Sequence, residues 1–130
     1  MGWGTLLSQI RTAFTGDSDL SGALNALDFE EVVNTPAFPY GTYKYIAGSG
    51  QTSNGNVRLD SKLIQFSLFD KGSDAATLAA AYDKLIALYD NLNVASGGRT
   101  YQFDWEFDES YKVEGVWHII CQYRVTDHPT

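Results

Sequence analysis

The residues best suited to acid–base or metal chemistry lie near the C-terminus. Asp104, Glu106 and Asp108 alternate with aromatic residues along one predicted strand, and His118 falls on the next one. Carboxylates bind hard divalent cations, and a carboxylate beside an imidazole can act as an acid–base pair. Residues two apart are spread along a strand, however, so these carboxylates alone do not make a compact cation site. A solvated acidic face that keeps the protein soluble is the favoured interpretation.

Other signatures of catalysis are absent from the sequence. No glycine-rich phosphate loop follows a strand, no nucleophile elbow occurs, and no histidine pair has metal-binding spacing. Cys121 is the only cysteine, so the chain can form no internal disulfide, and we expect this residue to pack as a small apolar side chain. We therefore predict no enzyme activity, no cofactor and no metal. A hydrolase or small-molecule-binding domain that uses Asp104, Glu106 and His118 is the alternative from a different class.

Composition predicts a single domain over residues 1–130. The formal net charge is −7 and the nine basic residues are scattered, which argues against a protein that grips nucleic-acid phosphates. Aromatic residues make up 14% of the chain, and tyrosine and tryptophan suit protein interfaces. The N-terminus lacks the basic and apolar regions of a signal peptide, so we expect the chain to be cytoplasmic where it is made.

The clearest structural pattern runs from Val57 to Leu92. Ile64, Phe66 and Leu68 alternate with polar residues, which is typical of a half-buried strand. Ser73 can then cap a helix over 74–91. One stripe of that helix is apolar and is made of Leu78, Tyr82, Leu85, Tyr89 and Leu92. We expect the core to contain Ile64, Phe66, Leu68, Leu78, Tyr82, Leu85, Phe103, Trp105, Ile119 and Tyr123.

The remaining elements predict the fold class. Two helices are expected before residue 30, and strands are expected over 40–46, 101–108 and 116–125. Strands grouped beside segregated helices indicate an α+β domain. We predict an antiparallel sheet of about four strands with a long helix packed on one face and N-terminal helices.

The two C-terminal strands carry a register constraint. Tyr101, Phe103, Trp105 and Phe107 are predicted to share one face, and Trp117 opens an apolar set of the same parity. A two-residue turn at residues 114–115 would pair odd positions with even ones. We therefore expect a longer loop or a bulge between residues 108 and 116.

A polar loop is predicted at Gly48–Asn56, because these nine residues include no large apolar side chain. It can be a plain solvated loop or an assembly arm that becomes ordered against a partner. The tyrosines before it can form an interface patch or simply fill a strand. The interface candidates are Tyr40, Tyr43, Tyr45, Gln51, Thr52, Ser53 and Asn54.

Several segments together resemble a known family. These are Pro39-Tyr40 in a strand, the polar loop, Ile64–Asp70 followed by an alanine-rich helix, and Tyr123-Arg124-Val125 in the last strand. In this order they resemble the tail-terminator (tail-completion) proteins of long-tailed bacteriophages.

The resemblance implies a structural role in the virion. Such proteins form a ring, expected to be hexameric, that caps the head-proximal end of the tail tube, ends its polymerisation and forms the head–tail joining surface. The implied partners are other copies of the chain, the tail tube protein and a head-completion or connector protein, with no membrane partner. DNA would pass through the lumen without specific binding, with Asp104, Glu106 and Asp108 facing lumen or solvent. The implied location is the tail or neck of the virion, and the host cytoplasm during assembly. A head-completion or connector protein is the second interpretation.

Overall fold

The framework of the protein is one mixed β-sheet, seen in a computed structural model that describes residues 2–30, 37–52, 58–72, 75–96 and 98–129. The strands within these residues are β1 (Leu27–Phe29), β2 (Tyr40–Thr52), β3 (Arg58–Lys71), β4 (Asn93–Ser96), β5 (Arg99–Val113) and β6 (Val116–Pro129). Their order across the sheet is β1-β2-β3-β6-β5-β4. β1 runs parallel to β2, and the other neighbouring pairs are antiparallel.

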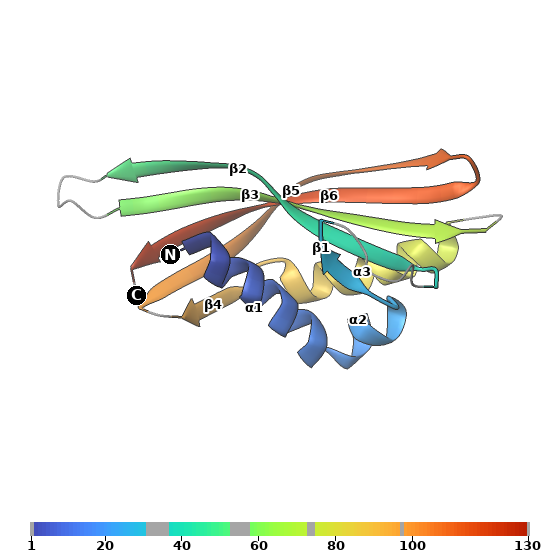
Figure 1. The fold of residues 1–130 in the computed structure, drawn as a ribbon, viewed down its shortest axis with the longest axis horizontal. Helices are drawn as coiled ribbons and strands as arrows, with labels where there is room; N and C mark the ends of the chain where they lie inside the picture. Colours follow the sequence, from blue (N-terminus) through green and yellow to red (C-terminus); the bar gives the residue numbers. More distant parts are fainter. Residues whose placement is uncertain (1, 31–36, 53–57, 73–74, 97, 130) are drawn as a thin grey trace.

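The helices of the described part of the chain lie on one side of this sheet (Figure 1). They are α1 (Gly2–Gly16), α2 (Ser18–Ala23) and α3 (Ala76–Tyr89). Asp17 caps α2, because its carboxylate accepts a hydrogen bond from the Leu20 N–H at 2.9 Å. The predicted cap of α3, Ser73, lies outside the described residues. No helix in the described ranges has both the length and the apolar character needed to cross a membrane.

The predicted fold class is wrong. In place of four antiparallel strands under a long helix, the described residues form a six-stranded mixed sheet with short helices. Two of the strands, β1 and β4, have three and four residues. Strands this short show no alternation that a sequence pattern could detect, and they form because β2 and β5 offer them backbone partners.

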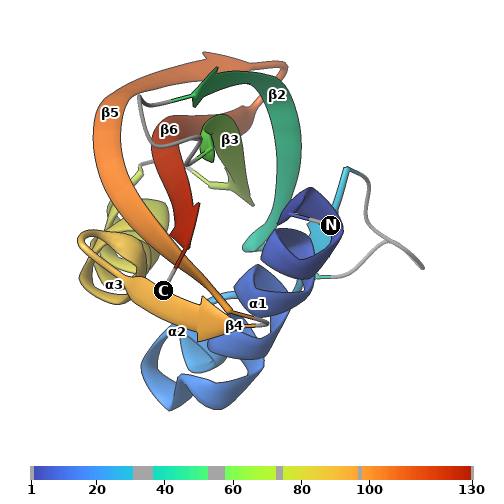
Figure 2. The same cartoon turned by 90° about the vertical axis from the view of Figure 1, so that its left-hand side faces the viewer.

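The sheet is strongly twisted and curls into a half-barrel (Figures 1 and 2). Alternation along β3 defines its two faces. Ile64, Phe66 and Leu68 are buried on the side of the helices, which we name the helix face. Leu63, Gln65, Ser67 and Phe69 are half-buried on the opposite side, which we name the open face.

The core lies between the helix face and the three helices. Phe66 is at its centre, with ring centroids 4.7 Å from Tyr89 of α3 and 5.9 Å from Tyr123 of β6. The Tyr89 hydroxyl donates a hydrogen bond to the Ile10 carbonyl at 2.8 Å and so joins α3 to α1. Most of the predicted core is confirmed as buried, but Tyr82 is half-buried and Trp105 is 44% exposed.

The register constraint on the two C-terminal strands is met in an unexpected place. The β5–β6 connection is a two-residue turn in which Glu114 and Gly115 both have positive φ, 51° and 81°, as a tight type I′ hairpin requires. The one-residue shift occurs upstream, as a bulge between Trp105 and Phe107. The expected loop or bulge between residues 108 and 116 is therefore wrong in position, and Phe107 is placed on the open face.

The predicted polar loop is shorter than expected. β2 continues through Thr52, and its residues from Gly48 onward pair with β3 between Arg58 and Lys62. The candidates Gln51 and Thr52 are therefore strand residues. Ser53 and Asn54 lie outside the described residues.

The different environments of two aromatic side chains predict different costs of truncation. Phe66→Ala should lower the free energy of unfolding by about 3–5 kcal/mol, because it empties a fully buried site. Trp105→Ala should cost about 1 kcal/mol, because nearly half of that side chain already contacts solvent. Chemical denaturation of both variants measures the difference, and equal losses would contradict this assignment of core and surface.

Candidate assembly surfaces

The three carboxylates considered for chemistry do not converge. Asp104 and Glu106 lie on the open face beside Arg124, whose Nε is 3.3 Å from Glu106 Oε1. Asp108 follows the bulge and is on the helix face, where its Oδ2 accepts a hydrogen bond from the Tyr82 hydroxyl at 2.7 Å. No group of three metal-ligating side chains forms among the described residues. The acidic strand is therefore split between the two faces.

His118 is placed among aromatic rings. Its imidazole is 4.7 Å from the Phe69 ring, edge to face, and 4.8 Å from the Tyr111 ring, stacked, between centroids. It pairs across the ladder with Tyr111, whereas Asp104 pairs with Arg124 further along β6. At about 3.3 Å per residue, this separates His118 from Asp104 by roughly 20 Å. The acid–base pair of the alternative hydrolase interpretation is not assembled.

The cysteine is equally unsuited to nucleophilic chemistry. Cys121 is buried on the helix face, as predicted. Burial raises the pKa of its thiol to about 12, so the thiol stays protonated at neutral pH.

A continuous line of rings crosses the open face, and we name it the aromatic row. Neighbouring centroids in this row are between 4.7 and 5.2 Å apart. The row crosses β2, β3, β6 and β5, and its members in order are Phe38, Tyr40, Phe69, His118 and Tyr111. Phe38 and Tyr111 at its two ends are 38% and 39% exposed. Partly exposed aromatic residues of this kind are enriched at protein interfaces.

The three tyrosines predicted as an interface patch are separated by the fold. Tyr40 belongs to the aromatic row. Tyr43 is buried in the core, where its hydroxyl donates to the Leu7 carbonyl at 3.3 Å, so it is not part of the surface. Tyr45 is half-buried. The sequence indicated Tyr40, but the partners of its ring come from strands far apart in the chain, and no local pattern indicates them.

A second aromatic feature joins α3 to β5. The Trp105 Nε1 donates a hydrogen bond to the Tyr82 hydroxyl at 3.2 Å, and that hydroxyl donates to Asp108. Burial, and then the bond to the Asp108 carboxylate, raise the pKa of Tyr82. The three side chains border a shallow hollow of about 250 Å³ together with Ile86 and Asp90. The network holds the exposed Trp105 ring in place.

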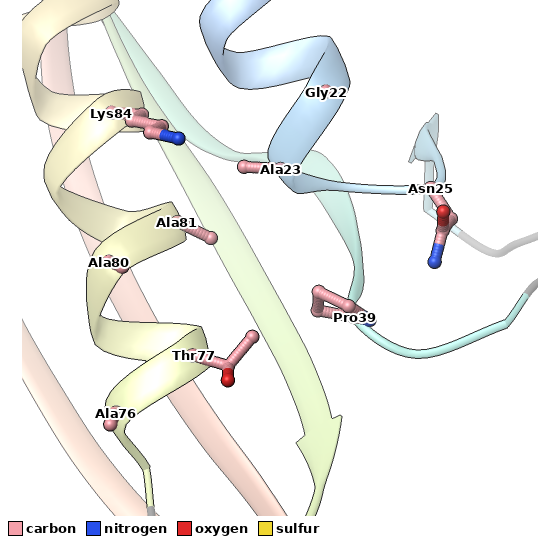
Figure 3. Close-up of a pocket in the computed structure, with 9 residues that line it drawn as sticks. All are labelled: Gly22, Ala23, Asn25, Pro39, Ala76, Thr77, Ala80, Ala81 and Lys84. Carbon is pink, nitrogen blue, oxygen red and sulfur yellow. The ribbon is translucent and has the colours of Figure 1, made fainter.

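A groove of about 570 Å³ lies between α2 and α3 (Figure 3). Asn25 anchors one wall, because its Nδ2 donates to the carbonyls of Ala37 and Phe38 at 2.9 and 3.0 Å. The lining is mostly small and includes no acid, histidine or cysteine among the described residues: Gly22, Ala23, Asn25, Pro39, Ala76, Thr77, Ala80, Ala81 and Lys84. The groove is concave, but none of these lining side chains is suited to catalysis.

Comparison with known proteins gives a likeness of fold. A chain in the virion of a native gene transfer agent (GTA) particle superposes with a TM-score of 0.74 at 11% sequence identity, covering 92% of this chain and 91% of that one. A second solved chain, which carries no descriptive name, superposes with a TM-score of 0.61 at 19% identity, covering 95% and 96%. No protein-family model matches the sequence, and no curated protein matches it. At these identities the likeness shows the fold alone.

The hydrogen bonds of Tyr82 predict a modest loss of stability on their removal. Tyr82→Phe should lower the free energy of unfolding by about 1–2 kcal/mol, because Asp108 and Trp105 both lose their partner. Chemical denaturation measures the loss, and Trp105→Phe combined with Tyr82→Phe tests the coupling. Strictly additive losses in this cycle would contradict a shared network.

The placement of His118 predicts a pH dependence of stability. Burial lowers the pKa of His118 in the folded state below its ordinary value of 6.5. Well above pH 6.5 the His118 imidazole is uncharged in both the folded and the unfolded protein. Below that pH the unfolded protein binds the proton more readily, so the free energy of unfolding falls as the pH decreases toward the pKa of the folded state. Unfolding of wild type and His118→Phe should be compared between pH 7.5 and 5. The free energy of unfolding should fall less between pH 7.5 and 5 in the variant than in wild type. An equal fall in both proteins would contradict the prediction.

Proposed function

We propose that this protein is a structural component of a phage-type virion, without enzymatic turnover, that assembles as a ring on the head-proximal end of the tail tube. In this role it would end tube polymerisation and present the surface to which a filled head is joined. The ring is proposed to be hexameric. Its partners would be further copies of the chain, the tail tube protein and a head-completion or connector protein.

The observation that carries this proposal is the fold likeness to a chain of the GTA virion particle. The superposition covers more than nine-tenths of both chains, so it involves the whole domain and not one shared motif. The order of sequence features that resembles tail terminators points in the same direction. Neither observation specifies the position in the virion, so the tail end is an inference from the resemblance.

The surfaces support an assembly role over the alternative hydrolase. His118 contacts rings and lies far from Asp104, and Cys121 is buried with a raised pKa. The open face instead offers the aromatic row, and every residue of β5 from Trp105 to Val113 is exposed. Large exposed apolar side chains of this kind are the material of protein interfaces.

A head-completion or connector protein is the second candidate, because the same likeness of fold is compatible with a protein on the head side of the head–tail joint. The two candidates differ in what the isolated protein binds. A terminator recognises the end of a tail tube, whereas a connector recognises the portal of a filled head.

Tail tubes polymerised from purified tube protein provide the test. Added during polymerisation, the protein should shorten the tubes and be visible as extra density at one end by negative-stain electron microscopy. The double variant Phe38→Ser/Tyr111→Ser, in which both exposed ends of the aromatic row are truncated, is tested alongside wild type as a protein with the same fold. Unchanged tube lengths with bare ends would refute the terminator role, and binding to isolated heads alone would favour the connector.

A further inference from the structure

We infer that the outer edge of β5 binds an extended, basic segment of a partner protein. The segment adds one strand to the sheet and places a lysine or arginine side chain in the hollow beside Trp105. This goes beyond the proposed function, because a strand can be added at this edge wherever the protein lies in a virion.

The outer edge of β5 is free over most of its length. β4 pairs only with residues 99–102 of β5, and Phe103 exchanges backbone hydrogen bonds with Asn91 and Leu92. Beyond Phe103, none of the described strands lies beside this edge, and residues 105–113 are all exposed. An exposed strand with unpaired N–H and C=O groups is a template for a further strand.

The register identifies the backbone groups that this edge offers. Phe103 bonds outward to the segment just before β4, and from this residue the backbone groups alternate between outward and inward. The bulge at Glu106 shifts this alternation by one residue. The N–H and C=O groups of Asp108, Ser110 and Lys112 therefore point outward, whereas those of the residues between them face β6.

The two faces of the free stretch differ in character. Phe107, Tyr111 and Val113 lie on the open face and are 40%, 39% and 47% exposed. Asp108 and Lys112 lie on the helix face, where they contact Tyr82 and the Trp117 ring. Side chains directly opposite each other on neighbouring strands interact, so a matching strand has apolar residues on one face and polar residues on the other.

The hollow of about 250 Å³ between β5 and α3 gives the partner segment a second anchor. It is lined by Trp105 and Asp108 of β5, Tyr82 and Ile86 of α3, and Asp90, which directly follows α3. Neither carboxylate forms an ion pair with a basic side chain in the described part of the chain. A lysine or arginine side chain in the hollow would contact both carboxylates and the Trp105 ring, which attracts a cation.

The charges along β5 favour a basic partner. The free stretch carries four carboxylates, which are those of Asp104, Glu106, Asp108 and Glu109. Arg124 of β6 pairs with Glu106, and the one basic residue of the free stretch, Lys112, lies near the turn with its Nζ 5.1 Å from the Trp117 ring centroid. The C-terminal end of α3 adds partial negative charge beside the hollow. A second copy of β5 would bring four more carboxylates, so a basic segment of another protein is the better match.

Amide hydrogen exchange of the full chain, followed by NMR, tests the added strand. The probe is the capped peptide Val-Thr-Val-Thr-Val-Arg-Val-Arg, which in antiparallel pairing places threonines opposite Lys112 and Ser110 and an arginine opposite Asp108. The same peptide with glutamate in place of each arginine is the control. The basic peptide should slow exchange of the Ser110 and Lys112 amides about tenfold when about nine-tenths of the protein is bound, and the acidic peptide should leave both rates unchanged.

Substitutions test the edge and the hollow separately, with peptide binding measured by titration calorimetry. Ser110→Pro removes an outward N–H at a position where an edge strand accepts proline, and it should weaken binding about tenfold, whereas Ser110→Ala should not. Asp90→Asn removes a charge from the hollow and should weaken binding severalfold. Asp83→Asn makes the same change on the exposed side of α3, outside the hollow, and should have no effect. The Asp90 comparison decides the matter if Ser110→Pro does not fold.

Several results would overturn the inference. They are unchanged exchange of the Ser110 and Lys112 amides with the basic peptide, equal protection by the acidic peptide, and binding that Asp90→Asn leaves unaltered. Protection that rises with protein concentration in the absence of peptide would show that a second copy occupies the edge, which also refutes a basic partner segment. Tube capping is measured by the separate tube-length assay, so the terminator role and the strand-addition site can fail independently.

Discussion

The arrangement of the candidate surfaces on β5 depends on the register of β5 against β6. The tight turn at Glu114–Gly115 fixes odd positions of one strand opposite even positions of the other. The extra residue at Glu106 then reverses the faces of β5, because the side-chain period of a strand is two. Upstream of the bulge the aromatic residues face the core, and downstream they face outward. The aromatic row and the Tyr82–Asp108 bond both follow from this shift.

The two ends of the sheet are held together by different interactions. At the end near the β5–β6 turn, rings stack across four strands on the open face. At the other end, Asp127 is buried beside two basic side chains: Arg99 Nε donates to its Oδ1 at 2.7 Å, and Lys62 Nζ is 3.9 Å from its Oδ2. A buried carboxylate needs such partners, so this cluster ties β3, β5 and β6 together. The end near the β5–β6 turn therefore presents rings on the open face, whereas ion pairs hold the other end.

The features that the sequence predicted correctly are those marked by a periodic pattern within one helix or strand. The alternation around Phe66 and the stripe through Leu78 and Leu85 were recognised because each is complete within one element. The strands β1 and β4 were missed because they depend on the edges they join. The aromatic row was missed because Tyr40, Phe69, His118 and Tyr111 meet only through the register of four strands. Candidate sites built across strands are in general beyond the reach of a one-dimensional pattern.

An open sheet edge is a hazard for a protein, because it can pair with a strand of another chain. The long strands β2 and β5 each carry a bulge, at Ile46 and at Glu106, and bulges interrupt indiscriminate pairing. The carboxylates of β5 add repulsion between like edges, and the net charge of −7 adds repulsion between whole molecules. The bulges and the acidic charge thereby oppose indiscriminate strand pairing between molecules.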